Sequence, residues 1–225
     1  MPVVYASLMA TFVLMVLLAF WGPPTGGAPL PPTQPAAGRV LIANPQLVDP
    51  GFGHSVVLLL AYSDHGAMGL MLNRPTQVSL ARLLPEELRW EDPELTVYRG
   101  GPVESGELRL LVRSATTPAG AVGVLPHVYL AADLTTLHRL RERELSPSDV
   151  RAYAGYAGWA PGQLEQEIAR GDWSLGHATA SIVFEQRPER LWPRLIKQWG
   201  GLWARDNPGP GDSDLSGDRT WTTTL

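Results

Sequence analysis

Cysteine is absent from the 225 residues, and lysine occurs once, as Lys197. The absence of cysteine excludes disulfides, thiolate nucleophiles and thiolate-rich zinc sites. A single lysine this close to the C-terminal end excludes a P-loop lysine and a Schiff-base lysine in the middle of the fold. The patterns G-x-S-x-G, H-E-x-x-H and G-x-G-x-x-G are also missing. The sequence therefore lacks the usual signatures of hydrolases, zinc proteases and dinucleotide-dependent enzymes.

Positive charge is not in excess, because 18 Lys and Arg stand against 22 Asp and Glu, for a formal net charge of −4. A nucleic-acid-binding domain is expected to present a basic surface, so the composition argues against nucleic acid as a partner. The histidines lie in different segments with no i, i+4 spacing, whereas a metal site needs several convergent ligands. We therefore expect no metal site and no cofactor. The histidines are His54, His65, His127, His138 and His177.

The first 21 residues contain an apolar run, VVYASLMATFVLMVLLAFW, from Val3 to Trp21. As a helix this run would be about 28 Å long, close to the roughly 30 Å hydrocarbon core of a bilayer. We predict that it is a membrane anchor. A cleaved signal peptide and a gene start placed too far upstream are the alternatives. The flanking charges are too few to predict the orientation in the membrane.

The rest of the chain divides into three parts. Residues 22–38 contain six prolines and are predicted to form an extended linker. Residues 39–203 have the length and apolar content of one folded domain. Residues 204–225 are rich in Asp, Gly, Pro, Ser and Thr, which predicts a disordered tail.

Strands dominate the predicted domain. Two apolar runs, one over Ser55–Tyr62 and one beginning at Ala67, are separated by the turn sequence SDHG and predict a β-hairpin. The first run is apolar at successive residues, so we expect both of its faces to be buried. Further short strands are predicted over residues 95–99, 107–113, 128–130, 151–156 and 173–176.

Three helices are predicted. Asp133 is a good N-cap for the first, and Pro161 and Gly171 are suited to begin and end the second. The third covers residues 189–199, and Pro193 either lies in its first turn or kinks it. Strands outnumber helices and do not alternate regularly with them, which favours an α+β fold.

Five residues are candidates for a ligand site: Asn73, Arg74, Gly101, Trp159 and Gln163. Asn73 and Arg74 close a strand with groups that can bind a carboxylate or phosphate, or can bond carbonyls of a neighbouring loop. Gly101 allows a close approach by a ligand or by another strand. Trp159 can stack on a ligand or fill the core. Gln163 lies where the first N–H groups of a helix form a generic anion site.

Three segments, in this order and spacing, resemble the AlgH/YqgE family of bacterial proteins. They are LIANPQLVDPGFGHSVVLLLAYSDHGAMGLMLNRP (Leu41–Pro75), YRGGPVE (Tyr98–Glu104) and GYAGWAPGQLEQEIARGDW (Gly155–Trp173). The resemblance covers nearly all of the predicted domain. It implies a single α+β domain with a mixed, branched β-sheet, partly curled into a small barrel and surrounded by helices. It also implies that the globular domain is cytoplasmic.

The resemblance implies no particular reaction, because the family has no established activity and its link with transcriptional regulation comes without a DNA-binding motif. Several positions depart from the family pattern: His54 stands where arginine is common, Arg113 where histidine is frequent, and Ala131 and Ala132 where a glycine pair occurs. The N-terminal apolar run and the proline-rich linker are additions to that pattern.

From these observations we expect a noncatalytic regulatory or interaction domain with an unknown protein partner, tethered to a membrane by residues 3–21. The alternative is a small-ligand-binding protein or an enzyme whose site forms around Asn73, Arg74 and Trp159. A DNA-binding regulator is a third hypothesis, which the charge of the chain disfavours.

Overall fold

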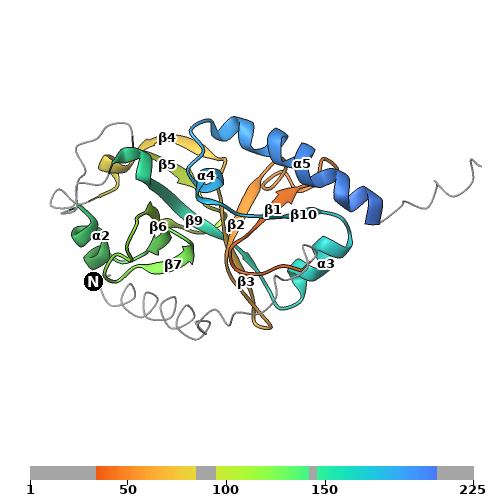
Figure 1. The fold of residues 1–225 in the computed structure, drawn as a ribbon, viewed down its shortest axis with the longest axis horizontal. Helices are drawn as coiled ribbons and strands as arrows, with labels where there is room; N and C mark the ends of the chain where they lie inside the picture. The colour runs from red at the N-terminus through yellow and green to blue at the C-terminus, as the bar shows by residue number, and fades with distance from the viewer. Residues whose placement is uncertain (1–33, 85–94, 142–145, 207–225) are drawn as a thin grey trace, which may run out of the picture.

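A computed structural model of the chain describes residues 34–84, 95–141 and 146–206. Their architecture is one ten-stranded sheet, curled into a half-barrel, with a few short helices (Figure 1). The strands follow the order β10-β1-β2-β3-β9-β6-β8-β7, while β4 and β5 form a branch that joins at β9. They are β1 (Arg39–Ala43), β2 (Val56–Ser63), β3 (Gly66–Met71), β4 (Pro75–Ser79), β5 (Thr96–Arg99), β6 (Val103–Arg113), β7 (Val122–Leu125), β8 (Val128–Ala131), β9 (Val150–Trp159) and β10 (Trp173–His177).

The expected fold class is confirmed in part. The sheet is branched, but it is mostly antiparallel, and β5 with β9 is the one parallel pair within the described residues. The helices are too few and too short to surround the sheet as expected. The curled sheet buries much apolar surface against its own strands, as Val97, Leu110 and Ala152 do in one core cluster. The helices are α2 (Leu134–Arg141), α3 (Gln163–Ala169), α4 (Ala180–Val183) and α5 (Leu191–Asp206), with 3-10 turns η1 (Leu80–Arg82), η3 (Pro147–Asp149) and η4 (Pro188–Arg190).

The predicted hairpin is confirmed as β2 and β3, which pair antiparallel with Ser63 opposite Gly66. The apolar run of β2 is buried on both faces because it lies between β1 and β3 inside the sheet. Val56, Leu58 and Leu60 pack into one core cluster, and the intervening residues Val57 and Leu59 pack into another on the opposite face. Alternate side chains of one strand thus join two halves of the core.

Strand β9 is the centre of the sheet. One of its edges pairs with β6, and the other pairs first with β5 and then with β3. Gly155 lies between the residues that pair with β5 and those that pair with β3, and its φ of +70° is a conformation that glycine adopts without steric cost. A Cβ at this position would lie 2.7 Å from the carbonyl oxygens of Gly101 and Val103. The branch in the sheet therefore depends on glycine at this bend.

Two of the three predicted helix-end signals are confirmed, but Pro161 does not begin α3, which starts at Gln163 after Gly162 at the N-cap with a φ of +75°. The Asp133 carboxylate accepts a hydrogen bond from the Thr136 backbone N–H at 2.8 Å, which caps α2. Gly171 has a φ of +84° and ends α3, where the Gly171 N–H donates to Ile168 O and the Asp172 N–H donates to Glu167 O. These two bonds form a Schellman motif. The motif turns the chain from α3 directly into β10.

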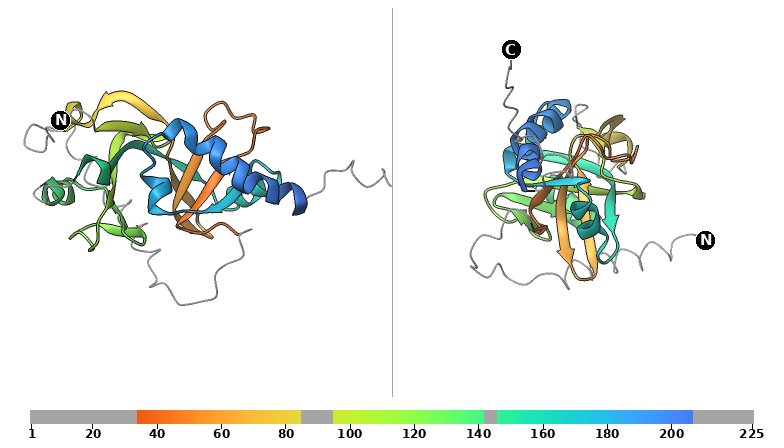
Figure 2. Two further views of the ribbon diagram at one scale, coloured as in Figure 1. Left: turned by 45° about the horizontal axis from the view of Figure 1, so that its top comes forward. Right: turned by 90° about the vertical axis from the view of Figure 1, so that its right-hand side faces the viewer.

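The C-terminal helix α5 lies across β1 and β10 (Figure 2). Its buried residues Leu191 and Leu195 join the core, and the Trp192 indole N–H donates to the carbonyl of Ala43 at 2.7 Å. Pro193 is the third residue of α5, where its missing N–H costs no helical hydrogen bond. The helix continues through Asp206, beyond the domain boundary at residue 203 that the sequence predicts.

The predicted membrane anchor over residues 3–21 lies outside the described residues, as do residues 22–33 of the linker and residues 207–225 of the tail. Within the part of the chain that the structure describes, no helix combines the length and the apolar character needed to cross a bilayer.

Candidate functional site

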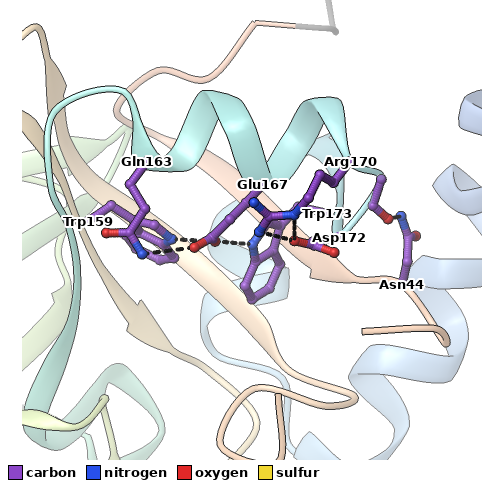
Figure 3. A network of polar contacts seen from close by, with 8 residues as sticks. Asn44, Trp159, Gln163, Glu167, Arg170, Asp172 and Trp173 are labelled. Atoms are coloured by element: carbon purple, nitrogen blue, oxygen red, sulfur yellow. Dashed lines mark hydrogen bonds and ion pairs between the residues drawn. The ribbon is translucent and has the colours of Figure 1, made fainter. Parts of the chain in front are cut away.

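Two of the five candidate residues meet at the carboxylate of Glu167 (Figure 3). Trp159 is the last residue of β9, and Gln163 is the first residue of α3. The Trp159 indole N–H donates to Glu167 Oε2 at 2.8 Å, and the Gln163 amide donates to Oε1 at 2.9 Å. Gln163 and Glu167 are four residues apart, so they occupy the same face of the helix.

A second tryptophan completes this cluster. Trp173, the first residue of β10, donates its indole N–H to the same Glu167 Oε2 at 2.8 Å. Both indoles are buried, with 7% of Trp159 and 2% of Trp173 exposed. Both carboxylate oxygens of Glu167 are therefore engaged in hydrogen bonds within the protein. Glu167 acts as a structural acceptor that joins the end of β9, helix α3 and the start of β10.

Further contacts hold this arrangement in place. Asn44 is buried, and its side chain donates to the carbonyl of Gly171 and accepts from the Ser174 hydroxyl at 2.8 Å. On the outer side of α3, the Tyr62 hydroxyl donates to Glu165 at 2.6 Å. This hydrogen bond, together with burial and the charge of Glu165, raises the pKa of Tyr62 to about 12.

A small pocket opens beside the two tryptophans. Its volume is about 140 Å³, and its walls include Leu47, Phe52, Trp159 and Trp173. The Phe52 ring lies 6.3 Å from the Trp159 ring and 5.9 Å from the Trp173 ring, centroid to centroid. We call this feature the aromatic pocket. It lies between the β1–β2 loop and α3.

The rim of the aromatic pocket is polar and carries more negative than positive charge. Its charged lining residues are Asp49, Glu167, Arg170 and Asp172, which is three carboxylates against one guanidinium. Arg170 donates to Asp172 from Nε at 3.1 Å and from a terminal nitrogen at 2.6 Å. Val48, beside Leu47 and Asp49 on the β1–β2 loop, is 92% exposed. An exposed apolar side chain thus lies next to an apolar hollow with an acidic rim.

Asn73 and Arg74 do not line this pocket. Asn73 is buried, accepts the Val56 backbone N–H at 2.9 Å and donates to the carbonyl of His54 at 2.9 Å. The Arg74 guanidinium donates to the carbonyl of Gly53. Burial and repulsion from Arg99 lower the pKa of Arg74. The two side chains therefore form hydrogen bonds with the loop that precedes β2. The sequence offered this role as the alternative to ligand binding.

Gly101 serves a close approach between strands. A Cβ at this position would lie 2.0 Å from the backbone carbon of Tyr156. The segment between β5 and β6 therefore crosses β9 in direct backbone contact. The sequence left open whether Gly101 allows the approach of a ligand or of another strand. In the structure it allows the approach of a strand.

Sequence reasoning missed Glu167, Trp173 and the exposed Val48. The spacing of Gln163 and Glu167 was a usable signal, because residues four apart on a helix are neighbours. The position of Trp173 directly after a helix-ending Gly-Asp pair was a second signal. Nothing local marks Val48, whose significance comes from the pocket beside it.

Comparisons with known proteins agree on one family. The family model described as AlgH-like matches residues 40–204. A UPF0301 protein of Streptomyces coelicolor is 36% identical over 186 residues, which cover 80% of this chain and 94% of that protein. A UPF0301 protein of Chlorobium luteolum is 33% identical over 167 residues, which cover 74% of this chain and 87% of that protein.

Two solved structures share the fold. The solution structure of the AlgH protein from Pseudomonas aeruginosa has a TM-score of 0.62 and 26% sequence identity, and the match covers 84% of this chain and all of that one. A crystal structure of a protein from Corynebacterium diphtheriae has the same TM-score and identity, with 73% of this chain and 87% of that chain covered.

Proposed function

This chain belongs to the AlgH-like family, and we propose that its folded body is a noncatalytic interaction domain that docks a protein partner at the aromatic pocket. The observation that carries the proposal is the exposed Val48 beside a small hollow walled by Leu47, Phe52 and the two tryptophans. The domain would have a regulatory role if docking changes the activity of that partner. Attachment to a membrane through residues 3–21 stays a prediction from the sequence.

The size of the pocket supports a protein partner over a small molecule. Small-molecule sites usually enclose roughly 300–1,000 Å³, whereas the aromatic pocket has about 140 Å³. That volume suits a single side chain. Protein interfaces concentrate binding energy where one anchor side chain fills such a hollow, surrounded by a polar rim.

The chemistry of the pocket supports binding without catalysis. The carboxylate of Glu167 accepts hydrogen bonds from two indoles and one amide, so both of its oxygens are already engaged. The side chains of Asn73 and Arg74 bond a neighbouring loop and contribute nothing to the pocket walls.

The rim indicates the chemistry of the partner. Three carboxylates face the pocket with one guanidinium, so a basic residue next to the anchor would be attracted, and an acidic one would be repelled. The proposed partner is a protein that presents an apolar or aromatic side chain next to a lysine or arginine.

Val48→Arg tests this proposal. The substitution replaces an exposed apolar contact by a charge that repels a basic partner, and it should lower partner recovery about tenfold, as for a residue worth roughly 1.4 kcal/mol of binding. The measurement is quantitative mass spectrometry of proteins crosslinked in cells to the tagged full-length chain. Because Val48 is 92% exposed, the variant should fold as the unsubstituted protein does.

Leu83→Arg is the matched control. Leu83 is also apolar and exposed, at 47%, but it follows η1, whereas Val48 lies between two residues that line the aromatic pocket, Leu47 and Asp49. The recovery of at least one partner should fall about tenfold with Val48→Arg and should stay within about twofold of the unsubstituted protein with Leu83→Arg. Equal recovery in the two variants, or no partner above a tag-only control, would refute the proposal.

A further inference from the structure

A second pocket, larger than the aromatic pocket, lies where β5, η3 and β9 begin. Its volume is about 450 Å³, which falls in the range of small-molecule sites. The polar side chains among its lining residues are Thr96, Tyr98, Ser146, Ser148, Arg151 and Gln186. We call it the hydroxyl pocket. None of its lining residues belongs to the aromatic pocket.

Charge in the hydroxyl pocket has one sign. Arg151 is the only charged side chain among the described lining residues. The nearby Asp149 carboxylate is paired with Arg113, with an N–O separation of 3.2 Å. Burial raises the pKa of Tyr98, and the charge of Glu189, which does not line the pocket, raises it further. The pocket is therefore suited to an anion.

The guanidinium of Arg151 is held in place by contacts that leave some of its N–H donors available. It donates to the Tyr98 hydroxyl and to the carbonyl of Glu185, the latter at 2.5 Å, and its guanidinium carbon lies 4.9 Å from the Tyr98 ring centroid. These two bonds use two of the five N–H donors of a guanidinium. The stacking on Tyr98 and the carbonyl bond fix the plane of the fork, which is the geometry that binds carboxylate and phosphate groups well.

Tyr98 supplies a second directed donor. Its oxygen accepts the hydrogen bond from Arg151, so its own O–H remains able to donate to another group. Burial raises the pKa of Tyr98, against the opposing charge of Arg151, and the hydroxyl therefore keeps its proton at neutral pH. Tyr98 is 5% exposed, which holds this donor in one place.

The remaining walls suit an organic molecule. The hydroxyl groups of Ser146, the N-cap of η3, and Ser148 lie 2.9 Å apart, and Leu95 and Val150 provide apolar surface. We propose that the hydroxyl pocket binds a small organic oxyanion, whose carboxylate or phosphate contacts Arg151 and the Tyr98 hydroxyl while its apolar part lies against Leu95 and Val150. This site goes beyond the proposed protein-docking function and does not depend on it.

The test is an NMR titration of the full-length protein with phenyl phosphate, benzoate and uncharged benzyl alcohol. At least one of the two anions should bind saturably and shift backbone signals of residues 95–98 and 146–151. The tighter anion identifies the preferred head group. Benzyl alcohol should bind at least about tenfold more weakly, because it carries no charge for the guanidinium.

Three variants locate the site. Arg151→Gln should weaken anion binding at least about tenfold, and Tyr98→Phe should weaken it several-fold, because each removes one proposed donor. Arg82→Gln removes one positive charge from an exposed side chain that does not line the pocket, and it should leave the affinity unchanged. Tyr98→Phe keeps the ring, so it decides the question if Arg151→Gln fails to fold.

Three results would overturn the assignment. The first is the absence of saturable binding by either anion. The second is anion binding that is as tight in folded Tyr98→Phe as in the unsubstituted protein. The third is equal weakening by Arg82→Gln and Arg151→Gln, which would indicate nonspecific attraction to net charge.

Discussion

Gly101→Ala is expected to destabilise the fold by more than about 4 kcal/mol, which is the range of severe core substitutions. The new Cβ would lie 2.0 Å from the backbone carbon of Tyr156, 2.1 Å from its oxygen and 2.2 Å from the nitrogen of Ala157. Because these are main-chain atoms of β9, no side-chain rotation relieves the overlap. Strand β9 has to move, and it pairs with β3, β5 and β6.

Urea unfolding of the full-length protein, followed by circular dichroism, measures this effect. Gly106→Ala is the matched control, since Gly106 lies in β6 and a Cβ there meets no atom within 4 Å. The control should change the free energy of unfolding by less than about 1 kcal/mol. If both variants unfold at the same urea concentration, the close crossing at Gly101 is not a structural requirement.

Glu167→Ala is expected to cost about 4 kcal/mol of unfolding free energy. The substitution leaves the indole N–H groups of Trp159 and Trp173 without their acceptor, and each buried donor left unsatisfied costs roughly 1–3 kcal/mol. Alanine is the best helix former, so helix propensity does not contribute to the loss. Tryptophan fluorescence should report the changed surroundings of the two indoles during the same unfolding experiment.

Glu165→Ala provides the control for this prediction. Glu165 lies on the same helix, is exposed, and accepts one hydrogen bond, from Tyr62. Its replacement should cost about 1 kcal/mol or less. Equal losses in the two variants would mean that the Glu167 cluster contributes no more than an ordinary surface contact.

The features predicted from sequence are those with local causes. The hairpin of β2 and β3 follows from two apolar runs on either side of a short turn, and their pairing is between neighbours in the chain. Asp133 and Gly171 act on the helix ends beside them. The family resemblance supplied the curled, branched sheet, whereas the ring of helices it implied is absent from the described residues.

Two of the strands that the sequence did not predict, β1 and β4, pair with strands that lie further along the chain. Strand β1 is five residues long, and it is stabilised by pairing with β10, whose paired residues lie 130 to 138 positions away in the chain. Strand β4 begins with Pro75 and is mostly exposed, so it has neither the composition nor the alternation of a typical strand. It forms because β5 lies beside it.

In the candidate site, too, the contacts predicted from sequence are those between residues of one segment. Trp159 and Gln163 were predicted from the residues of one segment, and they do come together. Their common partner Glu167 and the second indole, Trp173, become neighbours only because the Schellman motif after α3 reverses the chain. Asn73 and Arg74 had the right chemistry for a ligand site, but a neighbouring loop takes up their hydrogen bonds. A sequence lists donors and acceptors without showing which of them are already engaged.

The most direct test of the proposed interaction domain places a photocrosslinking amino acid at position 48 or at position 83 of the full-length chain in cells. Position 48 lies between the pocket-lining residues Leu47 and Asp49, and position 83 is another exposed apolar site whose side chain does not line the pocket. We expect a discrete crosslinked protein from position 48 that is absent from position 83. Identical crosslinking patterns from the two positions, or none from position 48, would contradict it.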